Sequence, residues 1–292
     1  MLLSILVGGK NDNYAADSNG KGGVCKRLEL TLNKTIDNLK RLGKTDVEVV
    51  VCDWGSESRI ADSLLKEKHP QVKFVYVSPD ICKKYNNGSS YSIVHPYNVS
   101  FQNSTGEYVV FWDSDCFMPF EHFKKVYEFA QKLKETKDKK FYWGSRFHIP
   151  RSAYVDANGF EDVDTFLEDC VIDPSQPNKT PSDKILRHDK INLQNFGGCA
   201  MALMMPRSIG EDSTCWWEEL QFWGWQDIEL HHRLNRKYIF GGDIEELGIF
   251  FFHLDHHEAP PHPFFNEHKV SKAFKANGTV WGLSNEKLEV TT

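Results

Sequence analysis

A short apolar run that ends in two closely spaced carboxylates constrains the fold of this chain more than any other stretch. Residues 108–112 are β-branched or aromatic with no polar alternation, which predicts a buried strand. Asp113 and Asp115 follow it directly. The carboxyl ends of strands in a parallel α/β sheet open into the ligand crevice, so two acids there can bind one hard cation and a ribose hydroxyl. An ordinary acidic turn after a strand is the alternative.

Strands and helices are predicted to alternate along the first part of the chain. Apolar runs at residues 2–7, 47–52 and 72–77 predict strands, and Gly43 is expected to end a helix between the first two. That helix is defined by apolar residues at helical spacing: Leu28, Leu32, Ile36 and Leu39. Ser56 or Ser58 is expected to cap a second helix, which carries Ile60, Leu64 and Leu65. The alternation predicts an α/β fold with a Rossmann-like, mostly parallel sheet flanked by helices.

Three further elements and one long connection complete the expected organisation. Residues 120–133 predict another helix against the sheet, and residues 141–143 a short strand. The polar segment 151–190 reads as a long connection or lid. Another apolar run, residues 250–252, predicts a late strand that ends in a histidine.

Composition excludes several classes of protein. The 292 residues are 40% apolar, and 35 Lys and Arg stand against 41 Asp and Glu, with no basic stripe to indicate nucleic-acid binding. No apolar run approaches the roughly 20 residues of a membrane span. Seven cysteines without a Cys-x-x-Cys pair favour a reducing compartment, so a cytoplasmic protein is expected. An N-terminal anchor outside this sequence would reverse that expectation.

The block from Asn98 to the two acids resembles the central motif of GT-A fold glycosyltransferases. The shared pattern is Asn-x7-Gly-Glu-Tyr-Val-Val-Phe-Trp-Asp-Ser-Asp, with Tyr97 and Ser100 departing from a usual basic residue and a usual glycine. In that family the Asp-x-Asp (DXD) pair holds the metal that bridges the donor diphosphate. The resemblance therefore implies metal ligation by Asp113 and Asp115 and donor contacts at Asn98 and Asp113.

Two more stretches suggest donor contacts. Val-Cys-Asp-Trp-Gly-Ser around Asp53 resembles the family's Val-Val-Asp-Asp-Gly-Ser motif, although Trp54 replaces the second acid. The resemblance implies that Asp53 accepts the N3–H of uracil, which would make the donor a UDP-sugar; a plain turn is the alternative. The pair Gly197-Gly198 looks like the family's glycines before a strand. Gly198 either lets backbone approach the donor sugar or makes a bend.

The segment 222–234 resembles the Gly-Trp-Gly-x-Glu-Asp-x-Glu-Leu motif of inverting GT-A enzymes, including galactosyltransferases and bacterial polysaccharide synthases. Asp227 is expected in the first turn of a helix, where the helix dipole favours the carboxylate. The resemblance implies that Asp227 is the catalytic base, although Gln226 and Phe222 depart from the usual glutamate and glycine. A helix acid that serves only as a charge cap is the alternative. Trp223 is the expected platform for an acceptor sugar.

The late histidine completes the expected metal shell. In the family a histidine one strand after the aspartate helix ligates the metal opposite the DXD pair, and His253 fits best, with His256 the alternative. A mixed oxygen and nitrogen shell favours Mn²⁺, with Mg²⁺ the second choice. A histidine-rich tail that binds zinc by itself would leave the upstream DXD unexplained.

The sequence therefore predicts one GT-A catalytic unit over residues 1–292. Residues 1–119 are its nucleotide-binding half, 120–263 its acceptor-binding half and 264–292 a C-terminal tail. The expected reaction is metal-dependent, inverting transfer of a hexose from a UDP-sugar to a hydroxyl of a glycan or another acceptor. A metal-dependent nucleotidyltransferase and a catalytically silent sugar-binding module are the alternatives.

Overall fold

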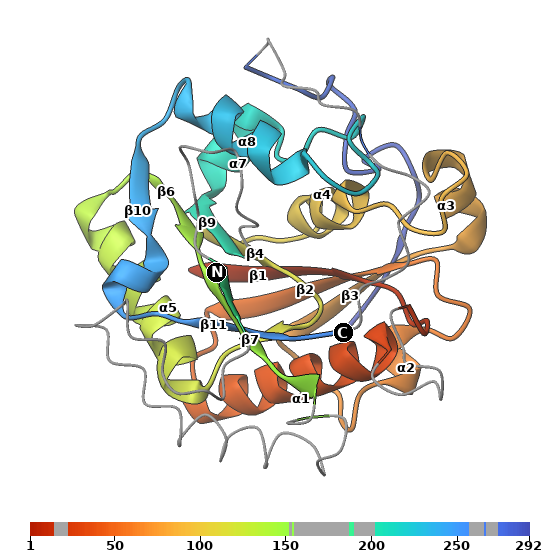
Figure 1. The fold of residues 1–292 in the computed structure, drawn as a ribbon, viewed down its shortest axis with the longest axis horizontal. Coiled ribbons are helices and arrows are strands. Elements are labelled where there is room, and N and C mark those ends of the chain that lie inside the picture. The colour runs from red at the N-terminus through yellow and green to blue at the C-terminus, as the bar shows by residue number, and fades with distance from the viewer. Residues whose placement is uncertain (15–22, 152–153, 155–186, 190–201, 257–265, 267–273) are drawn as a thin grey trace.

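A central sheet runs through the molecule between two layers of helices (Figure 1). The computed structural model describes residues 1–14, 23–151, 154, 187–189, 202–256, 266 and 274–292. Within this part of the chain the sheet contains, in spatial order, β10 (Phe240–Asp243), β6 (Phe141–Gly144), β9 (Ala202–Pro206), β4 (Tyr108–Trp112), β1 (Leu3–Gly9), β2 (Val47–Trp54), β3 (Val72–Val77) and β12 (Glu289–Thr291).

Parallel pairing dominates the sheet, as the alternation of elements predicts. Strand β1 pairs in parallel with both β2 and β4, β2 pairs in parallel with β3, and β10 with β6. Strand β9 is antiparallel to β4 and β6, and β12 is antiparallel to the edge strand β3. The predicted α/β class, a mostly parallel sheet flanked by helices, is confirmed. The DXD acids follow β4, at the carboxyl end where such sheets open to ligands.

Helices cover both faces of the sheet. Figure 1 shows α1 (Val24–Leu42), α2 (Ile60–Ser63) and α5 (Phe120–Thr136) on one face. The opposite face carries α3 (Pro79–Tyr85), α4 (Val94–Gln102), α7 (Arg207–Ser213) and α8 (Gln226–Asn235). The predicted apolar face of α1 is buried against the sheet, and Gly43 ends the helix with φ +63°. The short 3₁₀ helix η2 (Ile244–Leu247) follows β10.

A smaller second sheet begins where the DXD segment ends. Its order is β5 (Cys116–Phe117), β11 (Phe251–Leu254), β7 (Arg146–Ile149) and β8 (Arg187–Asp189). Strand β11 is antiparallel to β5, with His253 opposite Cys116, and the N–H of Leu254 donates to the carbonyl of Asp115 (2.9 Å). This pairing brings the late strand alongside the second acid of the DXD motif.

Two sequence-based expectations need correction or qualification. Helix α2 is a single turn that ends at Ser63, and its first N–H, from Ile60, donates to Asp53 Oδ2 (2.9 Å). The prediction of a cap at Ser56 or Ser58 is therefore wrong, because the carboxylate of Asp53, at the end of β2, accepts the hydrogen bond from the first N–H of the helix. Most of the predicted connection or lid at 151–190 lies outside the described residues.

The C-terminal tail is part of the folded core. Trp281 and Leu283 are buried with the α4 side of the sheet, and β12 extends the sheet at β3. The division into halves stays a prediction. No helix in the described ranges is both long and apolar enough to span a membrane.

Candidate functional site

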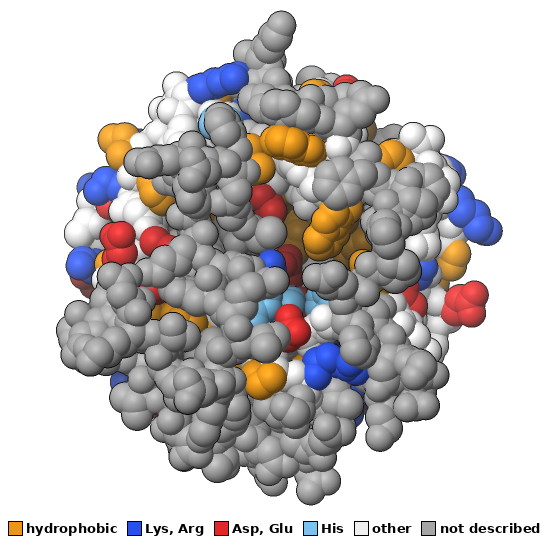
Figure 2. Space-filling model, viewed as in Figure 1, with side chains coloured by type: hydrophobic (Ala, Val, Ile, Leu, Met, Phe, Trp, Pro, Cys, Tyr) orange, Lys and Arg blue, Asp and Glu red, His pale blue; other side chains and the backbone are white. Residues whose placement is uncertain are grey.

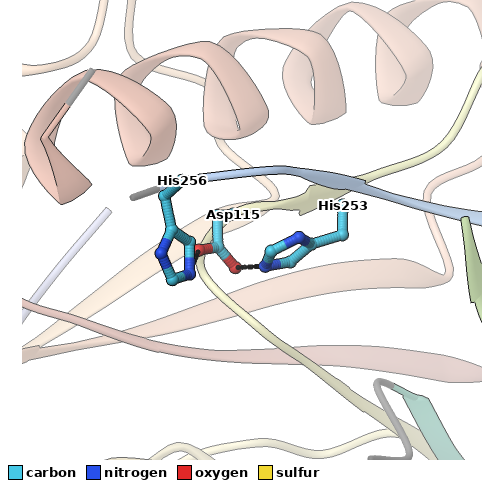
Figure 3. Close-up of side chains that lie close together, drawn as sticks. All are labelled: Asp115, His253 and His256. Atoms are coloured by element: carbon cyan, nitrogen blue, oxygen red, sulfur yellow. Dashed lines mark ion pairs between the residues drawn. The ribbon is translucent and has the colours of Figure 1, made fainter. Parts of the chain in front are cut away.

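Asp115 is the centre of a compact group of nitrogen and oxygen ligands. Figure 3 shows its carboxylate between two imidazoles, and His253 lies on β11. His253 Nε2 is 3.4 Å from Asp115 Oδ1, and His256 Nε2 is 3.8 Å from Oδ2. One ligand atom from each of the three residues lies within 4.8 Å of the others. This group combines the second DXD acid with both histidines that the sequence offered as alternatives.

A buried arginine holds Asp115 in place. Arg27, in the first turn of α1 and only 1% exposed, places its Nε 3.2 Å from Asp115 Oδ2. Burial raises the pKa of Asp115, but His253, Arg27 and His256 lower it by more and hold it well below its usual value. Burial lowers the pKa of His253 to about 4, so this imidazole is neutral at neutral pH, whereas the Arg27 guanidinium is charged. Asp115 is therefore a carboxylate with a neutral imidazole beside it.

Asp113 has different neighbours. The hydroxyl of Tyr97 donates to Asp113 Oδ1, and Arg146 Nη1, at the start of β7, is 3.9 Å from Oδ2. Burial and then the charge of Asp115 raise the pKa of Asp113 to about 6. Asp113 is not in the Asp115 ligand group. Its predicted role as a metal ligand stays a prediction.

Asp227 lies in the first turn of α8, as predicted. Burial and the charge of Asp113 raise its pKa to about 7, against a smaller opposing effect of Arg146. A carboxyl with that pKa can gain or lose a proton near neutrality, which is what general-base catalysis requires. The position that the resemblance singled out therefore carries a strongly perturbed acid.

The site residues from distant parts of the chain converge. Arg146 acts electrostatically on Asp113, Asp227 and His253, and Asp113 acts on Asp227. In Figure 2, histidine and acidic side chains lie side by side near the centre of the visible face, next to hydrophobic ones. Acids from β4 and α8 and the histidine from β11 thus surround one region at the carboxyl end of the sheet.

The start of α8 is fixed by a strained turn and a buried ion pair. Gly224 and Trp225 both have positive φ, +84° and +70°, which is uncommon for a tryptophan. One turn into the helix, Arg233 Nε donates to Glu229 Oε1 (2.8 Å), and its guanidinium also donates to the carbonyls of Ser213 and Cys215. Neither side chain of the pair is exposed to solvent. The helix that carries Asp227 is thereby tied to the loop after α7.

Asp53 has one carboxylate oxygen that bonds within the protein and one that does not. Oδ2 caps α2, whereas Oδ1 is buried and accepts no hydrogen bond from the described residues. Burial raises the pKa of Asp53, and hydrogen bonds from Ser56 and Ile60 oppose this. A buried acceptor without a partner costs free energy unless a donor reaches it. Its predicted contact with uracil is untested.

Asn98 takes part in a contact that the sequence did not suggest. Its Nδ2 donates to the carbonyl of Trp216 (2.8 Å) and to Glu218 Oε1 (3.0 Å), and its Oδ1 accepts from the N–H of Trp216 (3.0 Å). The side chain is fully buried and joins α4 to the segment before α8. A donor contact at Asn98 stays a prediction.

Trp223 and Gly198 are the remaining predicted contacts with ligands. Trp223 is 47% exposed, unlike Trp216, which is buried, and so is available to a ligand. Gly198 lies outside the described residues. Both residues that depart from the family motif make side-chain hydrogen bonds. The hydroxyl of Tyr97 donates to Asp113, and Ser100 Oγ donates to the carbonyl of Val7 (3.0 Å).

Four residues of the site were not found from the sequence. Arg27 on α1 contacts Asp115, and Arg146 on β7 lies beside Asp113. His148 on β7 places Nδ1 3.1 Å from His253 Nδ1 and 3.3 Å from Oδ1 of Asp255, which follows β11. Asp255 and His148 could be recognised only from the pairing of β11 with β7, which the sequence pattern alone does not predict. Lone arginines among 35 basic residues carry no motif that would mark them.

The chain is distantly similar to solved structures. No curated protein sequence matches the chain. Structures of S. aureus TarS residues 1–349, alone and in complex with UDP, are 16% identical and superpose with TM-scores of 0.41 and 0.43. Both alignments cover 89% of this chain and 59% of the TarS chain. The chain thus corresponds to somewhat more than half of those structures.

A sequence profile gives the family. The profile described as Glycosyl transferase family 2 matches residues 24–192, more than half of the 292 residues. This range includes the strand and helices that position Arg27, Asp53 and both DXD acids. The expected GT-A resemblance is confirmed, and the nucleotidyltransferase and silent-module alternatives are not favoured: the chain belongs to glycosyl transferase family 2 and is a glycosyltransferase.

Proposed function

We propose that this glycosyltransferase catalyses metal-dependent, inverting transfer of a hexose from a UDP-sugar to a hydroxyl of a glycan or another acceptor. The observation that carries the proposal is the juxtaposition of an acid with a pKa of about 7, Asp227, with the DXD acids and their histidine partners. Asp227 can accept a proton, and the DXD acids with the histidines can bind a cation.

The donor set around Asp115 supports a divalent cation. A carboxylate and two imidazoles within 4.8 Å of one another form a mixed oxygen and nitrogen set, which suits Mn²⁺ better than Mg²⁺. Asp115, with His253 or His256, would hold the ion, and Asp113, the first DXD acid, would be a further ligand. When bound, the ion would neutralise the negative charge that develops on the departing diphosphate. Arg27 keeps Asp115 oriented and ionised for that task.

The orphaned oxygen of Asp53 supports a uridine donor. Oδ1 is a buried acceptor with no partner in the described part of the chain, at the carboxyl end of β2. An imide N–H, such as N3–H of uracil, is the donor that would satisfy it. Cytosine has no N–H at that ring position, so Asp53 would discriminate between the two pyrimidines.

Asp227 is the proposed base. Above its pKa the carboxylate accepts the proton of the acceptor hydroxyl as the new bond to the anomeric carbon forms. Attack opposite the leaving diphosphate inverts the configuration at that carbon. Arg146 lowers the pKa of Asp227 and so favours the form that accepts the proton. The exposed ring of Trp223, in the loop before α8, would hold the acceptor sugar beside the base.

A donor screen tests the proposal. UDP release is measured from a panel of UDP-hexoses with Mn²⁺, with Mg²⁺ and after EDTA treatment, and CDP- and GDP-sugars are the matched controls for base recognition. We expect slow UDP release that requires the cation and disappears with EDTA. Metal-independent release, or no preference for UDP-sugars, would contradict the proposed donor and cofactor. Release of pyrophosphate from a nucleoside triphosphate would instead indicate a nucleotidyltransferase.

A further inference from the structure

We propose that His148, His253 and Asp255 form a second, buried metal site, of the kind that binds Zn²⁺, behind the Asp115 group. One ligand atom from each of these residues lies within 4.8 Å of the others. The site shares His253 with the Asp115 group, but the evidence for it does not rest on the proposed sugar transfer.

The backbone pairing of two strands builds this cluster. Strands β7 and β11 run in parallel with His148 paired to His253, so both side chains project from the same face of the second sheet. Asp255 comes two residues after His253, on that same face, and its N–H donates to the carbonyl of Ile149 (3.0 Å). The three ligands are therefore set by the strand register rather than by flexible side chains meeting at the surface.

The distances between the ligand atoms fit a small tetrahedral ion. His148 Nδ1 is 3.1 Å from His253 Nδ1 and 3.3 Å from Asp255 Oδ1. Ligand atoms about 2.0–2.1 Å from a tetrahedral Zn²⁺ lie roughly 3.3 Å apart, which matches both separations. The ligand atoms of His253 and Asp255 lie within 4.8 Å of each other. His148 is 1% exposed and His253 is 4% exposed, whereas the Asp255 side chain is 24% exposed and leaves a route to solvent.

Hydrogen bonds join these three atoms only through one shared proton. Two Nδ1 atoms and a carboxylate oxygen face one another, and a carboxylate can only accept. If Nδ1 of His148 carries a proton, it is shared between Asp255 and His253; if Nδ1 of His253 carries it, Asp255 faces a lone pair. A cation in the middle would use all three lone pairs at once.

The buried site also determines how His253 serves the Asp115 group. Its two ring nitrogens face opposite partners, Nε2 toward Asp115 and Nδ1 toward His148. A neutral imidazole has one lone pair, so an ion at Nδ1 leaves an Nε2–H that donates to Asp115 Oδ1. His256 is then the nitrogen ligand for a cation at Asp115. The inference thus separates the roles of two histidines that the sequence left as alternatives.

Cobalt spectroscopy on the full chain tests the site. The protein is stripped with EDTA and titrated with Co²⁺, whose visible absorption is strong in four-coordinate sites and weak in six-coordinate ones. We expect one equivalent of strongly absorbing Co²⁺ that Zn²⁺ displaces. His148→Ala and Asp255→Asn should each abolish the strong band. Asp115→Asn and His256→Ala, which change ligands of the other group and none of this one, should keep it.

The opposite pattern would overturn the proposal. A strong band that persists in His148→Ala and Asp255→Asn but disappears in Asp115→Asn places the ion with Asp115 alone. Absence of the strong band in the unmodified protein also rejects the site. Far-UV circular dichroism checks each variant, and Asp255→Asn, at a partly exposed position, provides the test if His148→Ala does not fold. Zn²⁺ should raise the Tm of His256→Ala by more than that of the double variant His256→Ala, Asp255→Asn, in which both ligand groups are disrupted.

Discussion

The two acids of the DXD motif, two residues apart, lie in opposite electrostatic surroundings. Asp115 has a side chain 11% exposed, contacts Arg27 and two histidines, and has a pKa held well below its usual value. Asp113 faces Tyr97 and Arg146, and partial burial and the charge of Asp115 raise its pKa to about 6 against their opposing effect. One acid is prepared to hold positive charge, and the other shares an excess of negative charge with Asp227. The motif therefore joins a cation side, made by Asp115, Arg27 and the histidines, to a proton-transfer side, made by Asp113 and Asp227.

The most severe test of the proton-transfer side is Asp227→Asn. The amide cannot accept the proton, so we expect turnover to fall by about three orders of magnitude or more, with donor binding retained. Turnover is measured by UDP release and donor binding by calorimetry. Asp62→Asn removes an exposed acid from α2 and serves as the matched control. Unchanged turnover in Asp227→Asn would remove the base from the mechanism.

Arg27→Met tests the cation side. Removing the one permanently charged partner leaves a buried carboxylate at Asp115, which should cost roughly 3–5 kcal/mol of unfolding free energy. Mn²⁺ should restore part of that loss, because it replaces the missing positive charge. The free energy is measured by denaturant unfolding with and without Mn²⁺. The neighbouring Lys26→Met, at an exposed position, should change stability little. A metal-independent loss would mean that Arg27 acts through packing only.

The pH dependence separates the two acids further. The raised pKa of Asp227 means that its carboxylate predominates only above about pH 7, so kcat/KM should rise as the pH increases through that value. Asp113→Asn removes a charge that raises this pKa, and the rising limb should move to lower pH. The sign is opposite for stability, because a raised carboxyl pKa favours folding at low pH and this contribution is lost as the pH rises toward 7. Residual rates of Asp113→Asn, measured across pH, check the direction of the shift.

The smallest expected effect lies at the edge of the site. Trp223→Ala removes an exposed ring, so we expect stability to change by less than about 0.5 kcal/mol. Acceptor KM should rise about tenfold, while the slow hydrolysis of the donor stays the same. Val280→Ala, at another exposed apolar position, is the control. A loss of donor hydrolysis instead would place the tryptophan on the donor side.

The sequence predicted much of the framework because its signals are local. Apolar runs gave the strands β1 to β4, helical spacing gave the buried face of α1, and the acid after β4 and the histidine of β11 do meet. The predicted serine cap of α2 was wrong because Asp53, seven residues before Ile60, accepts the hydrogen bond from the first N–H of the helix. Arg27 and Arg146 were not predicted because their importance comes from long-range packing. The pairing of His148 with His253 depends on strand register, which local pattern does not determine.

Asn266 has a consequence for altering the acceptor. Its side chain lies within hydrogen-bonding distance of the carbonyls of Leu220, Phe222 and Gly224, and its N–H donates to the carbonyl of Trp223. The conformation of the loop that carries Trp223 is therefore stabilised by hydrogen bonds to a residue more than forty positions later in the chain. A segment 220–225 grafted into this chain from a relative must therefore be compatible with Asn266, because the short segment does not encode its own shape.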